Sequence, residues 1–146
     1  MNTLVVFDSA AGNTERIANA IAAGIGPSVK AIRINSPEAR QLEKTSLLIV
    51  GSPTYGGRPT EGMLKYLNGL SLPSKTLKVA TFDTRLKMKL SKLFGYAADK
   101  MGTHFKEKGI MIKGKPEGFI VKGRNGPLAE GELERANSWG KSLLSD

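Results

Sequence analysis

The sequence contains no cysteine and only one histidine, His104. Without cysteine the chain has no disulfide scaffold, no thiolate nucleophile, no cysteine zinc site and no iron–sulfur ligand set. A single imidazole also excludes a metal centre built from several histidines. We expect His104 to be a surface or packing residue and no side chain to act as a catalyst or a metal ligand.

Long hydrophobic runs and an excess of acidic residues are also missing. No apolar stretch approaches the roughly 20 residues that a membrane span requires, and the first apolar run, residues 4–7, is far shorter than a signal-peptide core. We therefore expect a cytoplasmic protein with no membrane partner. The 22 Lys and Arg residues outnumber the 13 Asp and Glu residues, which gives a formal net charge of +9. This charge favours acidic partners and says nothing about the fold.

The chain's 146 residues suit one domain of common size, so we predict a single domain over residues 1–146, and a monomer. Short apolar runs alternate with helical patterns, which is typical of an α/β fold with a parallel sheet. The predicted strands cover residues 3–8, 29–34, 46–52, 77–82 and 110–121, the last in two pieces, 110–112 and 119–121. The predicted helices cover residues 13–25, 60–70, 90–108 and 130–144, and residues 37–44 form a short helix or a turn. Lys30 and Arg33 indicate that the second strand lies at an edge.

The first predicted strand leads directly into a helix through residues 8–16. Small hydroxyl residues, Gly12 and the pair Asn13-Thr14 leave backbone N–H groups at the positive end of the helix dipole. Such a loop can hold a phosphate, but it is equally well explained as a capped helix start. It matches neither the Gly-x-Gly-x-x-Gly pattern nor the Walker pattern.

Two further loops follow the third and fourth predicted strands. Residues 51–59 place Tyr55 in a tight turn, where its ring can stack on a flat heterocycle or pack on its own loop. Residues 81–85 include Asp83 and Thr84, which can cap the next turn or face a polar ring edge. For Asp83 alone, capping is the favoured interpretation. Ligands of open parallel sheets bind beyond the carboxyl ends of the strands, where all three loops are expected.

Together, the segments Ser9-Ala10-Ala11-Gly12-Asn13-Thr14, Ser52-Pro53-Thr54-Tyr55-Gly56-Gly57 and Phe82-Asp83-Thr84-Arg85 resemble the phosphate loop and the two isoalloxazine loops of flavodoxins. The match in length and element order covers essentially the whole chain. The total length is similar to that of a short-chain flavodoxin. It implies a flavodoxin-like three-layer sandwich with a five-stranded parallel sheet of order 2-1-3-4-5, helices on both faces and one noncovalently bound FMN.

The resemblance also implies the cofactor-binding residues. They are Ser9, Ala10, Ala11, Gly12, Asn13 and Thr14 around the phosphate, Ser52, Pro53, Thr54, Tyr55, Gly56 and Gly57 beside the ring, and Phe82, Asp83, Thr84 and Arg85 at its pyrimidine edge. In flavodoxins the peptide around the first glycine of the second loop can rotate to bond ring N5 on reduction. Gly56 or Gly57 is the candidate, because glycine makes such a rotation cheap.

Three departures from the flavodoxin pattern carry consequences. Ala11 replaces the usual Thr or Ser and removes one hydroxyl contact, worth about 1–3 kcal/mol. Residues 84–88 hold no aromatic, where flavodoxins often place a tyrosine, so we expect stacking on one ring face only. The basic charge is opposite to that of acidic electron-carrying flavodoxins. If Arg58, Arg85, Lys87, Lys89 and Lys92 surround the ring, the reduced anionic flavin is stabilised and its potential is less negative; otherwise these residues form a solvated face.

We predict a low-potential one-electron carrier for an acidic redox protein, rather than an enzyme. Two alternatives stay open: an FMN-dependent NAD(P)H:quinone-type reductase, which needs a second pocket over the flavin, and a flavodoxin-like interaction module that has lost FMN. Nucleic acid is a disfavoured partner because the basic residues are scattered. Lys122 and Arg124 lie in the basic loop before the last helix. This loop is either a simple connector or part of a surface on which a partner docks.

Overall fold

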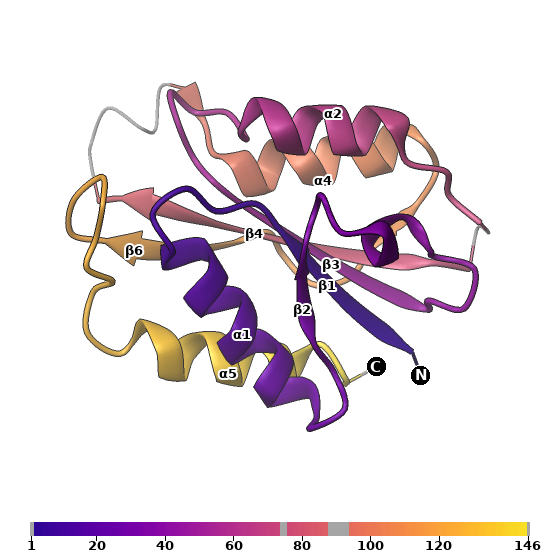
Figure 1. The fold of residues 1–146 in the computed structure, drawn as a ribbon, viewed down its shortest axis with the longest axis horizontal. Coiled ribbons are helices and arrows are strands. Elements are labelled where there is room, and N and C mark those ends of the chain that lie inside the picture. Colours follow the sequence, from indigo (N-terminus) through magenta and orange to yellow (C-terminus); the bar gives the residue numbers. More distant parts are fainter. Residues whose placement is uncertain (1, 74–75, 88–93, 146) are drawn as a thin grey trace.

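The computed structural model describes residues 2–73, 76–87 and 94–145 and places a parallel sheet between two pairs of helices (Figure 1). The strands are β1 Thr3–Phe7, β2 Ala31–Arg33, β3 Leu47–Pro53, β4 Lys78–Leu86, β5 Met111–Ile112 and β6 Glu117–Val121. The helices are α1 Asn13–Ile25, α2 Glu61–Gly69, α4 Ala97–Glu107 and α5 Glu132–Ser142, with a short 3-10 helix at Pro37–Arg40.

The sheet has the order β2-β1-β3-β4-β5, and β6 pairs with β4 beyond the end of β5. Every pairing is parallel. β5 and β6 are the two pieces of the predicted fifth strand, separated by residues 113–116. The predicted α/β class and the 2-1-3-4-5 order are therefore confirmed, and β2 lies at the predicted edge.

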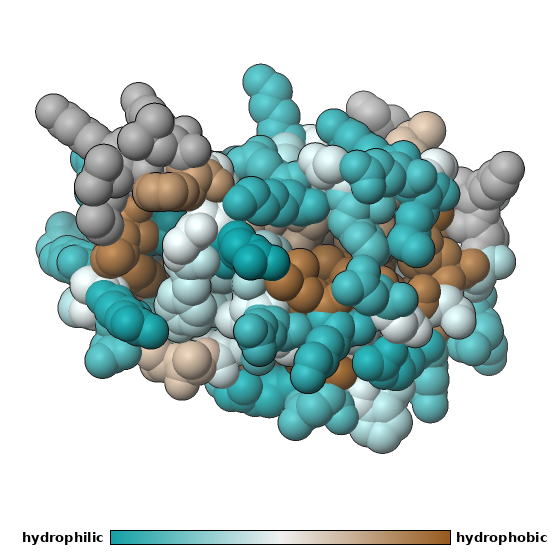
Figure 2. Space-filling model, turned by 90° about the horizontal axis from the view of Figure 1, so that it is seen from above, coloured by the Kyte–Doolittle hydropathy of each residue, from teal (hydrophilic) through white to brown (hydrophobic). Residues whose placement is uncertain are grey.

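Each face of the sheet has its own hydrophobic core. α1 and α5 cover one face, where Ile17 and Ile21 pack against Val5 and Ile49. α2 and α4 cover the opposite face. Seen from the side of α2 and α4, most of the surface is hydrophilic, and hydrophobic side chains show only in patches (Figure 2). In the described part of the chain, no helix is both long and apolar enough to cross a membrane.

The fourth strand is longer than predicted. Its expected end at residue 82 is wrong, because β4 continues to Leu86 while pairing with β3 and β6. Phe82 to Arg85 therefore belong to a strand and not to a loop. Ser52 and Pro53 likewise form the end of β3. Phe82 is fully buried and makes edge-on contacts with Phe119 and Trp139, at centroid distances of 6.2 Å.

The start of the third long helix also differs from the prediction. α4 begins at Ala97 rather than at residue 90, and residues 88–93 of that prediction lie outside the described residues. Gly95 has a φ of +81°, a left-handed conformation that interrupts a helix. Thr54, directly after β3, and Asp83 of β4 then accept the first N–H groups of α4, from Ala97 and Ala98 respectively, both at 2.9 Å.

Helices α1 and α5 approach so closely that glycine is required in each. A Cβ on Gly24 would lie 2.1 Å from the carbonyl oxygen of Asn137, and one on Gly140 would lie 2.4 Å from that of Ile21. Both obstacles are backbone atoms, which cannot rotate away. The two helices therefore pack backbone to backbone on one face of the sheet.

We predict that Gly24→Ala lowers the free energy of unfolding by about 2 kcal/mol, because the clash outweighs the gain in helix propensity. Chemical denaturation measures this change. Gly26→Ala is the matched control: Gly26 is extended, with φ 169°, and an added Cβ would meet nothing within 4 Å. An equal loss in both variants would contradict the proposed close packing.

Candidate functional site

A cavity of about 330 Å³ opens at the carboxyl edge of the sheet. Sites for small organic ligands are commonly of this size and lie in this position in parallel α/β folds. The cavity is lined by Ser9, Ala10, Ala11, Asn13, Thr14, Pro53, Thr54, Tyr55, Gly56, Thr84, Arg85, Leu86, Val121 and Arg124. Four segments far apart in the sequence thus meet at one place.

The loop between β1 and α1 offers unpaired backbone donors at one end of this cavity. Within the described chain, the N–H groups of Ala10, Ala11, Asn13 and Thr14 have no hydrogen-bond partner. They lie at the positive end of the α1 dipole, where an anion is stabilised. The Ser9 hydroxyl accepts from the N–H groups of Gly12 and Glu15, at 3.1 and 3.4 Å. The loop is therefore shaped before any anion binds.

Thr84 joins the first loop to the second. Its hydroxyl is 2.8 Å from that of Thr14, and both side chains are buried. The carbonyl oxygen of Thr84 accepts from the N–H of Thr54 at 2.9 Å. The end of β4 consequently fixes the position of both neighbouring loops around the cavity.

The second loop is a tight hairpin. Tyr55 and Arg58 exchange two backbone hydrogen bonds, at 2.9 and 3.1 Å. Gly56 and Gly57, between them, have φ values of +57° and +77°; positive φ at both central positions is typical of a type I′ turn. Gly56 lines the cavity and has free space around it. A Cβ on Gly57 would lie 2.4 Å from the carbonyl oxygen of Phe94. Only Gly56 of the two candidates for peptide rotation therefore reaches the cavity.

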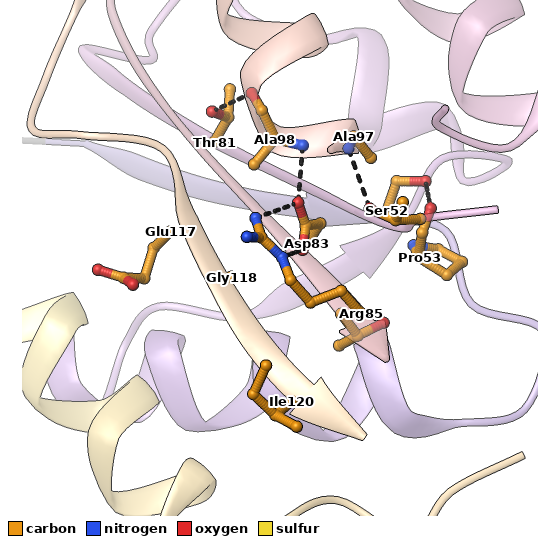
Figure 3. Close-up of polar contacts among 12 residues, drawn as sticks. Ser52, Pro53, Thr81, Asp83, Arg85, Ala97, Ala98, Glu117, Gly118 and Ile120 are labelled. Atoms are coloured by element: carbon orange, nitrogen blue, oxygen red, sulfur yellow. Dashed lines mark hydrogen bonds and ion pairs between the residues drawn. The ribbon is translucent and has the colours of Figure 1, made fainter. Parts of the chain in front are cut away.

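Asp83, which is fully buried, and Arg85, which is partly buried, form an ion pair on the α4 side of the sheet (Figure 3). The guanidinium donates to both carboxylate oxygens, at 2.7 and 2.8 Å. It also lies 3.4 Å from the ring centroid of Tyr96. Burial raises the pKa of Asp83, and the charge and hydrogen bonds of Arg85 oppose this shift. Arg85 therefore lines the cavity with its charge neutralised by Asp83, and its contact with the ring edge stays a prediction.

The structure brings most of the predicted residues to the cavity. Five of the sixteen do not line it: Gly12, Ser52, Gly57, Phe82 and Asp83. Phe82 belongs to the hydrophobic core, and Asp83 caps α4 instead of a turn that follows it directly. The Ser52 hydroxyl accepts from the N–H of Thr60 at 3.1 Å and so links the two ends of the second loop. Gly12 provides the left-handed residue, φ +93°, that turns the first loop into α1.

Arg124, from the loop between β6 and α5, is a lining residue that the sequence reasoning did not assign to the site. Its guanidinium lies 5.4 Å from the centroid of the Tyr55 ring. The same loop packs against the first loop: a Cβ on Gly126 would lie 2.9 Å from the side chain of Asn13. The sequence did offer one signal for Arg124: it follows the fifth predicted strand, so its loop lies at the same edge of the sheet as the other three loops. Leu86 and Val121 were missed as well.

Arg124 also changes the expected charge around the cavity. Arg85 is neutralised, Arg58 does not line the cavity, and Lys89 and Lys92 lie outside the described residues. Among the described residues that line the cavity, none carries a carboxylate, an imidazole or an amine. In the described part of the chain, no group of three acidic, histidine or cysteine residues is arranged to hold a metal ion.

Comparisons with known proteins agree with this geometry. The family model described as flavodoxin matches residues 5–139, so the chain belongs to the flavodoxin family. The family assignment confirms the resemblance seen in the three loops and implies a flavin cofactor, generally FMN. Curated protein sequences include no match to the chain.

Solved structures show the same fold. Oxidised flavodoxin 1 from Bacillus cereus is 23% identical, with a TM-score of 0.79 over 99% of this chain and 97% of that chain. A flavodoxin from the domain Archaea is 20% identical, with a TM-score of 0.78 over 98% and 96%. A WrbA-like flavodoxin protein from Agrobacterium tumefaciens is 22% identical, with a TM-score of 0.74 over 97% and 94%.

Glu132 joins the start of α5 to β6, the two elements that flank the loop carrying Arg124. This carboxylate accepts from the N–H of Ile120 at 2.6 Å and pairs with Arg135 at 2.8 Å. The hydrogen bond from Arg135 lowers the pKa of Glu132. Because the pKa of Glu132 is lower in the folded state, its ionised form stabilises the fold at pH values above its unfolded pKa, 4.5. This stabilisation is lost as the pH falls through the folded-state pKa.

We predict that Glu132→Gln lowers the free energy of unfolding at pH 7 by about 1–2 kcal/mol, a range reduced because solvent screens the half-exposed Arg135. The difference from wild type should disappear well below pH 4.5. Denaturant unfolding at a series of pH values measures both effects. Glu134→Gln, an exposed position on the same helix, is the control. A pH-independent loss would show that the carboxylate charge is not responsible.

Proposed function

We propose that this protein binds one FMN noncovalently in the cavity and carries single electrons between other redox proteins. Bound FMN supplies the electron-carrying chemistry. The observation that carries the proposal is the set of unpaired N–H groups of Ala10, Ala11, Asn13 and Thr14, placed at the end of a cavity with an aromatic side chain on its wall. A phosphate and a flat heterocycle joined by a flexible chain fit this arrangement.

The first loop would hold the FMN phosphate. Its free N–H groups and the α1 dipole favour a dianion without any lysine. Thr14 already shares its hydroxyl with Thr84, so the backbone of the loop carries most of the binding. Ala11 lines the cavity but brings no hydroxyl group. Phosphate binding here therefore depends on N–H donors more than on side chains.

The second loop and the end of β4 would hold the flavin ring. Tyr55 is 37% exposed and can stack on one ring face, while Gly56 leaves its backbone free to approach the ring. Within the ranges 2–73, 76–87 and 94–145, the residues that line the cavity include no carboxylate, imidazole or amine that could move a proton to or from a substrate. This favours an electron carrier over an NAD(P)H:quinone-type reductase. The net charge of +9 supports an acidic redox protein as the partner.

We predict that FMN binds with submicromolar affinity and that Ala11→Ser strengthens binding about tenfold, because the new hydroxyl can donate to the phosphate. Titration of flavin-free protein with FMN, followed by quenching of flavin fluorescence, measures the dissociation constant. Riboflavin is the matched ligand, since it lacks the phosphate: its affinity should be the same for both proteins.

Two results would contradict this proposal. No quenching by FMN at tens of micromolar would leave the interaction module as the function. Rapid oxidation of NAD(P)H by the FMN-bound protein in the presence of a quinone would instead identify a reductase. A gain in riboflavin affinity equal to that for FMN would show that residue 11 does not face the phosphate.

Arg124 provides a test of the charge around the ring. We predict that Arg124→Gln makes the reduction potential of bound FMN about 20 mV more negative, because one positive charge about 10 Å away stabilises the reduced anion by about 0.4 kcal/mol. Potentiometric titration of the FMN-bound protein measures the shift. Lys30→Gln, an exposed position beside the edge strand β2, should leave the potential unchanged. Equal shifts in the two variants would indicate an effect of net charge alone.

A further inference from the structure

A second, more open groove adjoins the cavity on the outer side of β4. It measures about 560 Å³ and shares Leu86, Val121 and Arg124 with the lining of the cavity. Because three residues line both spaces, whatever occupies the groove lies next to whatever occupies the cavity. We call this space the basic groove.

The basic groove carries charge of one sign. Three exposed cations line it: Lys87, directly after β4, and Lys122 and Arg124, after β6. None of the described residues that line it is acidic. None of the three cations forms an ion pair with another residue that the structure describes. Arg33, Arg85 and Arg135, by contrast, each contact a carboxylate.

The groove also has an apolar floor. Leu86 and Ile120 are only partly buried and lie among the three cations. β6, which carries Ile120, lies at the outer side of β4 (Figure 3). An apolar centre with a charged rim is the usual composition of a protein-binding surface. A purely electrostatic site for a small anion would need no such floor.

The backbone of β6 is not free to accept an added strand. The N–H of Lys122 donates to the carbonyl oxygen of Pro127 at 2.8 Å, and the N–H of Ala129 donates to that of Ile120 at 2.9 Å. The N–H of Ile120 donates to Glu132. A partner must therefore bind through side chains, so the charges of Lys87, Lys122 and Arg124 decide which partner fits.

We propose that the basic groove is the docking site of the redox partner and that it receives an acidic surface segment, with carboxylates against the three cations and apolar side chains on Leu86 and Ile120. This inference rests on the proposed function, since it assumes FMN in the adjoining cavity. Docking here places the partner against two walls of that cavity, which shortens the path for the electron.

The test uses FMN-bound protein and a reduced plant-type [2Fe–2S] ferredoxin, an acidic one-electron donor of low potential. In anaerobic stopped flow, one electron leaves the cluster and enters the oxidised flavin, and flavin absorbance gives the second-order rate constant. We expect this constant to fall at least tenfold in the Lys87→Glu/Lys122→Glu double variant and to lose most of its dependence on ionic strength. Neither residue lines the FMN cavity.

A matched control reverses two charges elsewhere. Lys30 and Lys44 are exposed and line neither space, so Lys30→Glu/Lys44→Glu has the same net charge as the groove variant. We expect its rate constant to stay within about twofold to threefold of wild type, since distant exposed charges are largely screened. Equal slowing in the two double variants would overturn the docking proposal and leave a general charge effect.

FMN titration of each variant separates the two proposals. If all proteins bind FMN equally and the groove variant reacts at the wild-type rate, the docking site is wrong and the electron carrier stands. If wild-type protein binds no FMN, the proposed function fails, and the docking proposal fails with it. If the groove variant keeps the ferredoxin rate but loses binding of a labelled DNA oligonucleotide, the groove receives nucleic acid, which also overturns the proposal.

Discussion

A carboxylate inside a protein needs compensation for the water that it has lost, and this requirement at Asp83 organises the site. Arg85 supplies two hydrogen bonds, and the N-terminus of α4 supplies a third through Ala98. The pair therefore holds an arginine at the cavity wall in a neutralised state and fixes the start of a helix at once. Without Asp83, Arg85 would be a partly buried charge without its hydrogen-bonded carboxylate.

The orientation of Arg85 determines which charge the cavity presents. Because Arg85 is neutralised, Arg124 provides the guanidinium beside Tyr55. Arg124 belongs to a loop whose flanking elements, β6 and α5, are joined by Glu132, and Gly126 of that loop contacts Asn13. The cavity and the basic groove share this residue, so the flavin environment and the proposed partner surface depend on the same loop.

Local patterns in the sequence predicted the regular elements well where one face was apolar. α1 has the predicted bounds, 13–25, because Ile17, Ala18 and Ile21 form one buried stripe. The end of β4 was misplaced because polar residues at 83–85 indicated a loop, whereas pairing with β6 and the mutual compensation of Asp83 and Arg85 extend the strand. The hydrogen bond from Ala98 joins Asp83 in this strand to a helix fifteen residues further along the chain. A contact of this kind produces no periodic pattern in the sequence.

The sequence by itself determined the fold class, the strand order that its family resemblance implied, and the three segments that surround the cavity. Hydrophobic period and loop composition are local properties, and they suffice for these conclusions. Only the tertiary structure decided where each side chain of those segments points, that Arg85 faces α4, and that Arg124 completes the cavity. The physical reason is that Asp83, which holds Arg85, is itself fixed by the start of α4, and that Arg124 lies beside Tyr55. These contacts come from elements that the sequence does not place beside one another.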